Sequence, residues 1–202
     1  YVFVFVLGLS FVLLTVVFRS IVIAAVSIAL NLLSVGAAYG LVILVFKHGI
    51  GSGLLGFQRI DAIEAWVPLF LFSVLFGLSM DYQVFLLSRI KERYEETGST
   101  NEAVVHGVAS TARLITGAAL IIVAVFSGFA MGDLVMFQQM GFGIAVALLI
   151  DATIIRSVLL PAAMGLLGGW CWYLPPWLEW LPRIQIEHRE EPVTGPAAAS
   201  AP

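Results

Sequence analysis

The sequence is poor in charged residues. Of its 202 residues only 11% are Asp, Glu, Lys or Arg, whereas 60% are hydrophobic. A soluble domain of this length carries about 25% charged residues. We therefore expect an integral membrane protein. The ten Lys and Arg residues form no basic stripe, so no nucleic-acid partner is expected.

Cysteine and the patterns of catalytic sites are also scarce. Cys171 is the only cysteine, which excludes an internal disulfide framework and a Cys-based zinc site. The sequence contains no HExxH, GxSxG or Walker A pattern, so nothing supports a protease, a hydrolase or an ATPase. We expect no enzyme, no metal site and no organic cofactor. Residue 1 is a Tyr inside an apolar run, and we expect the chain to be part of a longer protein.

Long apolar runs dominate the rest of the chain. A helix needs about 20 residues to cross a bilayer, and five runs approach or exceed that length. The predicted spans cover residues 1–18, 21–46, 66–90, 114–131 and 135–155. A Gly-rich loop is expected over residues 47–65. The fold class is therefore all-α integral membrane, with a transmembrane domain over residues 1–168.

Three segments outside the spans differ from them in composition, and each is expected to form a different structure. Residues 100–110 follow a helix stop signal at Gly98 and are expected to form a short cytoplasmic surface helix. Residues 157–174 are interrupted by Pro161 and are rich in Trp, which favours an interfacial segment. Residues 187–202 are rich in Glu, Pro and Ala, which predicts a disordered cytoplasmic tail.

The basic residues are divided unequally between the two sides of the membrane. With five spans, eight of the ten lie on one side and only Lys47 and Arg59 on the other. Lys and Arg accumulate in cytoplasmic loops. We therefore expect a multi-pass protein of the plasma (inner) membrane, with Arg19 and the C-terminus in the cytoplasm.

One acidic residue lies deep in the third span. Asp81, with Tyr82 beside it, is sixteen residues into that helix. An Asp at the centre of a spanning helix costs about 2.5–3.5 kcal/mol on insertion scales, and such residues commonly mark ion or proton paths. Because hydrocarbon disfavours the ionised carboxylate, Asp81 is expected to bind and release a proton, with Tyr82 as its relay. The alternative is an Asp81 that only pairs with a neighbouring helix.

The surroundings of Asp81 suggest that it needs partners. Successive residues of a helix point about 100° apart, so Asp81 and Tyr82 are each expected to reach a different helix. Ser73 and Gly77 share one stripe with Asp81, which suits close approach by another helix. Possible relay or packing partners are Ser79, Thr116, Phe85, Ser127, Asn31 and Ser34.

A second acidic residue lies near the expected end of the fifth span. Asp151 is followed five residues later by Arg156. This arrangement favours a structural ion pair or a helix-end anchor over a second proton site.

Four stretches of the chain together resemble MMPL transporters, within the resistance-nodulation-division (RND) superfamily. They read FGLSMDYQVFLLSRI, STARLITGAA, IDATIIRSVLLPA and GGWCWY, in the order found in that family. The resemblance covers nearly the whole chain except the tail. It implies the C-terminal transmembrane half of a transporter, packed against an N-terminal half. Gly169 and Trp170 depart from the family pattern, in which acidic residues are common at this point.

The resemblance also implies a function. The family's Asp-Tyr pair, implicated in proton translocation, maps onto Asp81 and Tyr82, and Phe85 matches a bulky position beneath it. The expected function is export of lipids or other hydrophobic molecules across the plasma membrane, driven by the proton-motive force. The proton is then the coupling ion, and membrane lipids and the hydrophobic cargo are partners. The alternatives are a SecD/SecF-like or sterol-sensing relative, and a non-transporting membrane scaffold.

Overall fold

The computed structural model describes residues 1–51, 56–57, 63 and 66–178. Every regular element in these ranges is a helix. They are α1 (Val2–Phe18), α2 (Ile21–Val42), η1 (Ile43–Lys47), α4 (Trp66–Thr97), α5 (Thr100–Ala130), α6 (Val135–Ile150), η2 (Asp151–Leu159), α7 (Leu160–Leu167), η3 (Gly168–Trp172) and η4 (Pro176–Leu178). The predicted tail at residues 187–202 and most of the predicted loop at residues 47–65 lie outside the described residues.

Within the described ranges, four continuous helical stretches are long and apolar enough to cross a membrane. They are Ile21–Lys47, Trp66–Thr97, Thr100–Ala130 and Val135–Trp172, and Val2–Phe18 is a shorter apolar helix. The all-α membrane fold predicted from composition is confirmed, and the chain is a multi-pass membrane protein.

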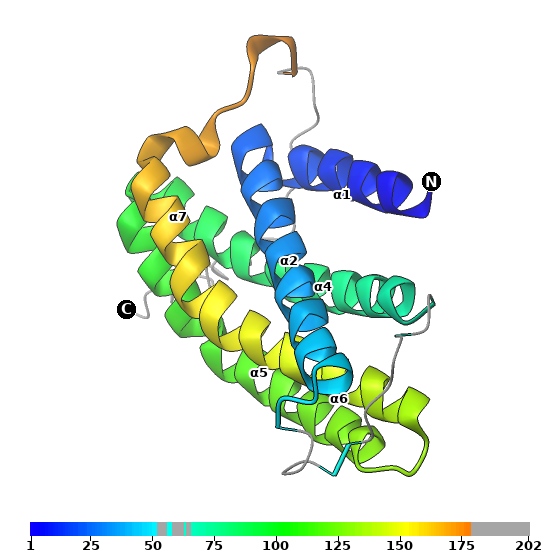
Figure 1. Ribbon diagram of the computed structural model, residues 1–202. Coiled ribbons are helices and arrows are strands. Elements are labelled where there is room, and N and C mark those ends of the chain that lie inside the picture. The colour runs from blue at the N-terminus through cyan, green and yellow to red at the C-terminus, as the bar shows by residue number, and fades with distance from the viewer. Residues whose placement is uncertain (52–55, 58–62, 64–65, 179–202) are drawn as a thin grey trace, which may run out of the picture.

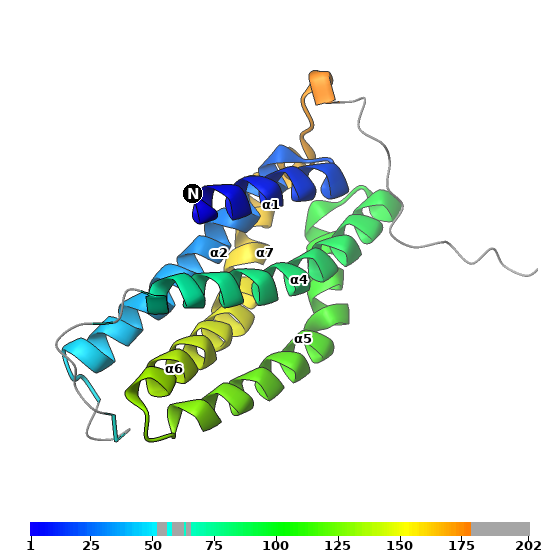
Figure 2. The same cartoon turned by 90° about the vertical axis from the view of Figure 1, so that its right-hand side faces the viewer.

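The helices form a bundle in which α1 lies at one side. α5 packs against both α4 and α6, and α2 packs against α1, α4 and α6. Figure 1 shows α2 running in the opposite direction to α6 and α7. In Figure 2, α1 turns back over the start of α2. We call the end of the bundle where this turn lies the Arg19 end.

Two short turns at the Arg19 end reverse the chain where the sequence predicts. Arg19 ends α1 in a left-handed conformation with φ 52°, and the Ser20 hydroxyl accepts a hydrogen bond from the amide of Ile23 to begin α2. Gly98, with φ 66°, ends α4, and Ser99 caps α5. Glycine suits the second turn because it adopts positive φ without a steric penalty.

The expected separate surface helix at residues 100–110 is wrong. Those residues are instead the first part of α5, which runs unbroken to Ala130. The hydroxyls of Ser110 and Thr111 donate to the carbonyl of Gly107 and so bond within the helix rather than ending it. α4 likewise continues past the predicted end of its span, because ion pairs such as Arg89–Glu92, at 2.9 Å, support its last turns.

The helix of the fifth predicted span does not end at residue 155. The helix continues beyond residue 155 through η2 and α7, and ends at Gly168, where φ is 52°. Pro161 does not break it and lies just after the junction at which the π-helical η2 passes into α7. Arg156 does not end it either, because its side chain turns inward and is buried.

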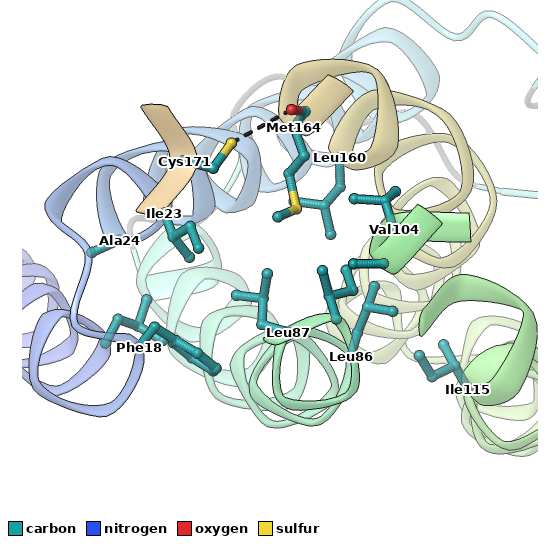
Figure 3. Close-up of a cluster of buried hydrophobic side chains, with 13 residues drawn as sticks. Phe18, Ile23, Ala24, Leu86, Leu87, Val104, Ile115, Leu160, Met164 and Cys171 are labelled. Atoms are coloured by element: carbon teal, nitrogen blue, oxygen red, sulfur yellow. Dashed lines mark hydrogen bonds between the residues drawn. The ribbon is translucent and has the colours of Figure 1, made fainter. Parts of the chain in front are cut away.

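The core of the bundle consists of two apolar clusters with polar residues between them. The cluster nearer the Arg19 end includes Phe18, Leu87 and Met164 (Figure 3), and the other includes Val42 and Leu71. Along α2, α4 and the α6–η2 helix, the residues between these clusters include buried polar ones. We call this set the polar layer, and it comprises Ser27, Asn31, Ser34, Ser79, Gln83, Asp151 and Arg156.

Candidate functional site

The outer face of α4 carries the predicted proton carrier. Ser73, Gly77, Asp81 and Phe85 recur every four residues and are all exposed on the surface of the bundle. The Ser73 hydroxyl donates to the carbonyl of Leu69 within its own helix, at 2.9 Å. Within the part of the chain that the structure describes, no hydrogen bond or ion pair reaches the Asp81 carboxylate. The outer face of α4 therefore carries the Asp81 carboxylate, which we call the bare carboxylate, on an otherwise apolar surface.

The inner face of α4 holds a buried ion pair. Nε of Arg156 lies 2.9 Å from Oδ2 of Asp151, and each side chain is only 5% exposed. The hydroxyl of Ser79 donates to the same carboxylate oxygen at 2.9 Å. Nη2 of Arg156 in turn donates to the hydroxyl of Ser79, at 2.9 Å, and to its backbone carbonyl. The pair is thus fastened to α4, because a single serine bonds to both of its members.

The helix that carries this pair is wound as a π-helix. η2 extends from Asp151 to Leu159. In an α-helix, residues five apart point about 140° away from each other. A π-helix forms its hydrogen bonds between residues five apart and so brings such residues onto one side. The ion pair therefore depends on the local winding, and π-helical segments are frequent at functional sites.

Tyr82 lies between the bare carboxylate and the buried pair. Its ring is 5.4 Å from Cζ of Arg156, within the range of a cation–π contact. Asp81, one residue earlier, points outward. The two residues of the Asp-Tyr pair therefore face different surroundings, and no hydrogen bond joins them in the described structure.

Several side chains that were predicted as partners of Asp81 lie elsewhere in the bundle. Ser79 belongs to the buried pair and does not contact Asp81. Thr116 lies on α5, where it lines a groove of about 210 Å³ together with Thr153 and Ser157. Among the described residues, Asn31, Ser34 and Ser127 form no hydrogen bond to Asp81 either, and the hydroxyl of Ser34 instead donates to the carbonyl of Ala147 at 3.4 Å.

Asp81 has no second acidic side chain beside it on its stripe of α4. Among the residues that the structure describes, no three His, Cys, Asp or Glu side chains are grouped closely enough to hold a metal ion. The bare carboxylate is accompanied on its stripe by Ser73, Gly77 and Phe85, and none of them is a second anionic ligand. A single carboxylate on an apolar surface can bind a proton or pair with a group from another helix.

Comparison with known proteins settles the family. The MMPL family model matches residues 2–193. This chain belongs to the MMPL family. The match spans all the described helices, including α4 with its Asp-Tyr pair and η2 with its ion pair.

Three similar proteins come from mycobacteria. The chain is 46% identical, over 92% of its length, to a mycolic acid-containing lipids exporter, MmpL11, of Mycolicibacterium smegmatis. It is 46% identical, over 88% of its length, to a protein of Mycobacterium tuberculosis named heme uptake protein MmpL11. It is 43% identical, over 83% of its length, to the trehalose monomycolate exporter MmpL3 of M. smegmatis. The chain spans 20%, 18% and 16% of these relatives, respectively.

Sequence reasoning missed two features of the site. Ser79 was expected only as a possible partner of the relay, whereas it joins Asp151 and Arg156. The π-helical winding was not expected at all. The one signal for it was the five-residue spacing of an acid and a base inside an apolar run, which fits a π-helix better than an α-helix.

Proposed function

We propose that this chain is the C-terminal membrane half of a transporter that exports lipids or other hydrophobic molecules and is driven by the proton-motive force. The observation that carries the proposal is the bare carboxylate of Asp81 on the outer stripe of α4. The names of two similar proteins, which describe exporters of mycolic acid-containing lipids and of trehalose monomycolate, support the lipid cargo. The chain has a transport role and no catalytic residues.

The proposed partner of the outer stripe is the N-terminal half of the same transporter. An Asp left in hydrocarbon costs about 2.5–3.5 kcal/mol, so a polar partner or a bound proton is needed there. The small residues Ser73 and Gly77 allow another helix to approach closely at this point. A helix of the other half would then meet Asp81 directly.

The mechanism follows from the two states of Asp81. The ionised carboxylate prefers a polar partner on the facing half, and the protonated one does not. Proton binding from the outer side would therefore loosen the contact, and release to the cytoplasm would restore it, with Tyr82 and water as relay. Each charge that crosses the full field contributes about 2.3 kcal/mol per 100 mV. One or two protons per cycle could drive modest uphill movement of a lipid.

The proposed location is the plasma (inner) membrane, with the Arg19 end and the C-terminus in the cytoplasm. Among the described residues, Arg19, Arg89, Lys91 and Arg93 lie at that end, and Lys and Arg accumulate in cytoplasmic loops.

The test is the substitution Asp81→Asn in the full-length protein. The amide keeps the size and hydrogen-bonding capacity of the side chain but cannot carry a proton. We expect lipid export to be lost while the amount and thermal stability of the membrane-inserted protein stay unchanged. The matched control is Asp133→Asn, because Asp133 is an exposed acid in the turn between α5 and α6. If Asp81→Asn exports normally, the chain belongs to a scaffold or to a transporter with another ion path.

A further inference from the structure

The polar layer contains buried polar atoms that no side chain satisfies. Ser27 and Asn31 are 0% and 1% exposed. In the described part of the chain, the Ser27 hydroxyl and both polar atoms of the Asn31 amide have no hydrogen-bond partner, and neither has Nη1 of Arg156. A buried polar group without a partner costs about 1–3 kcal/mol. Four such atoms in one layer indicate that something other than a side chain binds them.

The hydroxyl of Ser27 differs from those of five other Ser and Thr residues in these helices. The hydroxyls of Ser73, Ser88, Thr97, Thr111 and Thr153 each donate to the carbonyl four residues earlier. Ser27 makes no such bond. Its hydroxyl is therefore available to a partner inside the bundle, on the same face of α2 as Asn31 one turn later.

The unpartnered atoms on α2 and on η2 lie in the same layer. α2 packs against both α6 and η2. The bond from Ser34 to the carbonyl of Ala147 places those two residues level with each other. The two helices run antiparallel (Figure 1). By helix geometry, one turn further toward the Arg19 end, about 5.4 Å along each helix, Asn31 comes level with Asp151. An amide oxygen and a guanidinium donor, each without a partner, are thus at one depth.

A small cavity adjoins this layer on the side of the Arg19 end. Its volume is about 10 Å³, and Ser27 lines it together with Ile23, Leu87, Leu160, Met164 and Cys171. Figure 3 shows these last five side chains around a common space, with the Cys171 thiol bonded to the carbonyl of Met164. This volume is at the lower limit of the room that one water molecule needs, and Ser27 is the lining residue that offers an unpartnered polar atom.

We propose that ordered water molecules occupy the polar layer between α2 and η2, bound by Asn31, Ser27 and Nη1 of Arg156. Water can donate to the Asn31 amide oxygen and accept from its NH₂ group and from Nη1. The guanidinium of Arg156 disfavours a cation at this site, and the burial of Asn31 excludes contact with a second protein half. The site hydrates the Asp151–Arg156 pair from inside this half, apart from the outward-facing Asp81. It does not depend on the proposed transport function.

The direct test is a cryo-EM map of the full-length protein in lipid, at a resolution that shows ordered water. We expect density within hydrogen-bond distance of the Asn31 amide and of Nη1 of Arg156. An empty space at this position, or an Asn31 amide bonded directly to another side chain, contradicts the proposal.

The second test asks whether the substitution Asn31→Leu lowers or raises the melting temperature of the full-length protein. If water is bound, Asn31→Leu removes a partner of that water and leaves Nη1 of Arg156 without one, so the melting temperature of the full-length protein falls. If the polar layer contains no bound water, the same substitution removes an amide that has no hydrogen-bond partner, and the melting temperature rises.

Two further variants complete this test. Asn31→Ser keeps a hydrogen-bonding group and leaves room for one more water molecule, so it is expected to remain close to the wild type. Asn101→Leu changes an exposed Asn on α5 and is the matched control, with no expected shift.

If Asn31→Leu does not insert into the membrane, the water density and a normal melting temperature for Asn31→Ser still support the site. A melting temperature for Asn31→Ser that exceeds the wild type contradicts it. These readouts do not involve export, so they remain informative if Asp81→Asn transports normally.

Discussion

The two faces of α4 differ in how their polar residues are satisfied. On the inner face, Ser79 bonds to both members of the Asp151–Arg156 ion pair. On the outer face, two residues further on, Asp81 has no partner among the described residues. Buried charges must be paired within a folded unit, whereas a charge at its surface can be paired later by another unit. The inner groups hold these helices together, whereas Asp81 is the group to which we assign the proposed proton and the proposed contact with the other half.

The largest expected effect comes from breaking the inner pair. Arg156→Met leaves the Asp151 carboxylate buried and without its cation, which costs about 3–5 kcal/mol of stability. We expect much less folded full-length protein in the membrane, as measured by fluorescence-detection size-exclusion chromatography. Asp81→Asn should show no such loss in the same assay.

A double substitution sharpens this prediction. Asp151→Leu combined with Arg156→Met replaces the pair with apolar groups and should recover most of the folded protein, because it leaves no unpaired charge. A double variant as unstable as Arg156→Met would contradict a purely electrostatic origin of the loss.

A smaller effect is expected at the residue that fastens the pair to α4. Ser79→Ala removes the hydroxyl that donates to Asp151 and accepts from Arg156. Hydrogen bonds to charged groups contribute about 1.5–3 kcal/mol, so the melting temperature should fall by less than in Arg156→Met. Ser73→Ala is the matched control on the outer face, because the Ser73 hydroxyl bonds only within its own helix. Equal shifts for the two serines would mean that the inner bonds do not stabilise the half.

The smallest effect on stability comes from comparing two glycines. A Cβ at Gly107 on α5 would lie 2.4 Å from Cγ1 of Ile90 on the inner side of α4, whereas a Cβ at Gly77 has nothing within 4 Å. Gly107→Ala should therefore lower stability by about 1–3 kcal/mol through overpacking. Gly77→Ala should leave the half stable, and it should lower export only if another helix packs on the outer stripe. Thermal unfolding and export assays separate the two effects, and the reverse pattern would contradict the assignment of the faces.

Much of the fold follows directly from the sequence. The apolar runs predicted the helices, Gly98 and Ser99 predicted the end of α4 and the beginning of α5, and Asp81 was recognisable because an acid rarely occurs within such a run. These signals are local. A chain segment of about 20 apolar residues, or a glycine with positive φ, carries its own structural information.

The remainder depends on tertiary contacts. A separate surface helix was expected over residues 100–110 after the stop at Gly98, but α5 continues to Ala130, and the hydroxyls of Ser110 and Thr111 bond within it. The end expected at Arg156 was inferred from its charge, but that charge is neutralised by Asp151 inside the bundle. The role of Ser79 depends on two helices far apart in sequence, so no local pattern could reveal it.

The proposed function requires that the outward-facing carboxylate of Asp81 bind a proton in the working protein. The most direct measurement is the infrared difference spectrum between mildly acidic and alkaline buffer, recorded on the full-length protein in lipid. We predict a band of a protonated carboxylic acid that disappears in Asp81→Asn and remains in Asp133→Asn. Spectra of the wild type and of Asp81→Asn that coincide would show that Asp81 does not take up a proton, and would contradict the account.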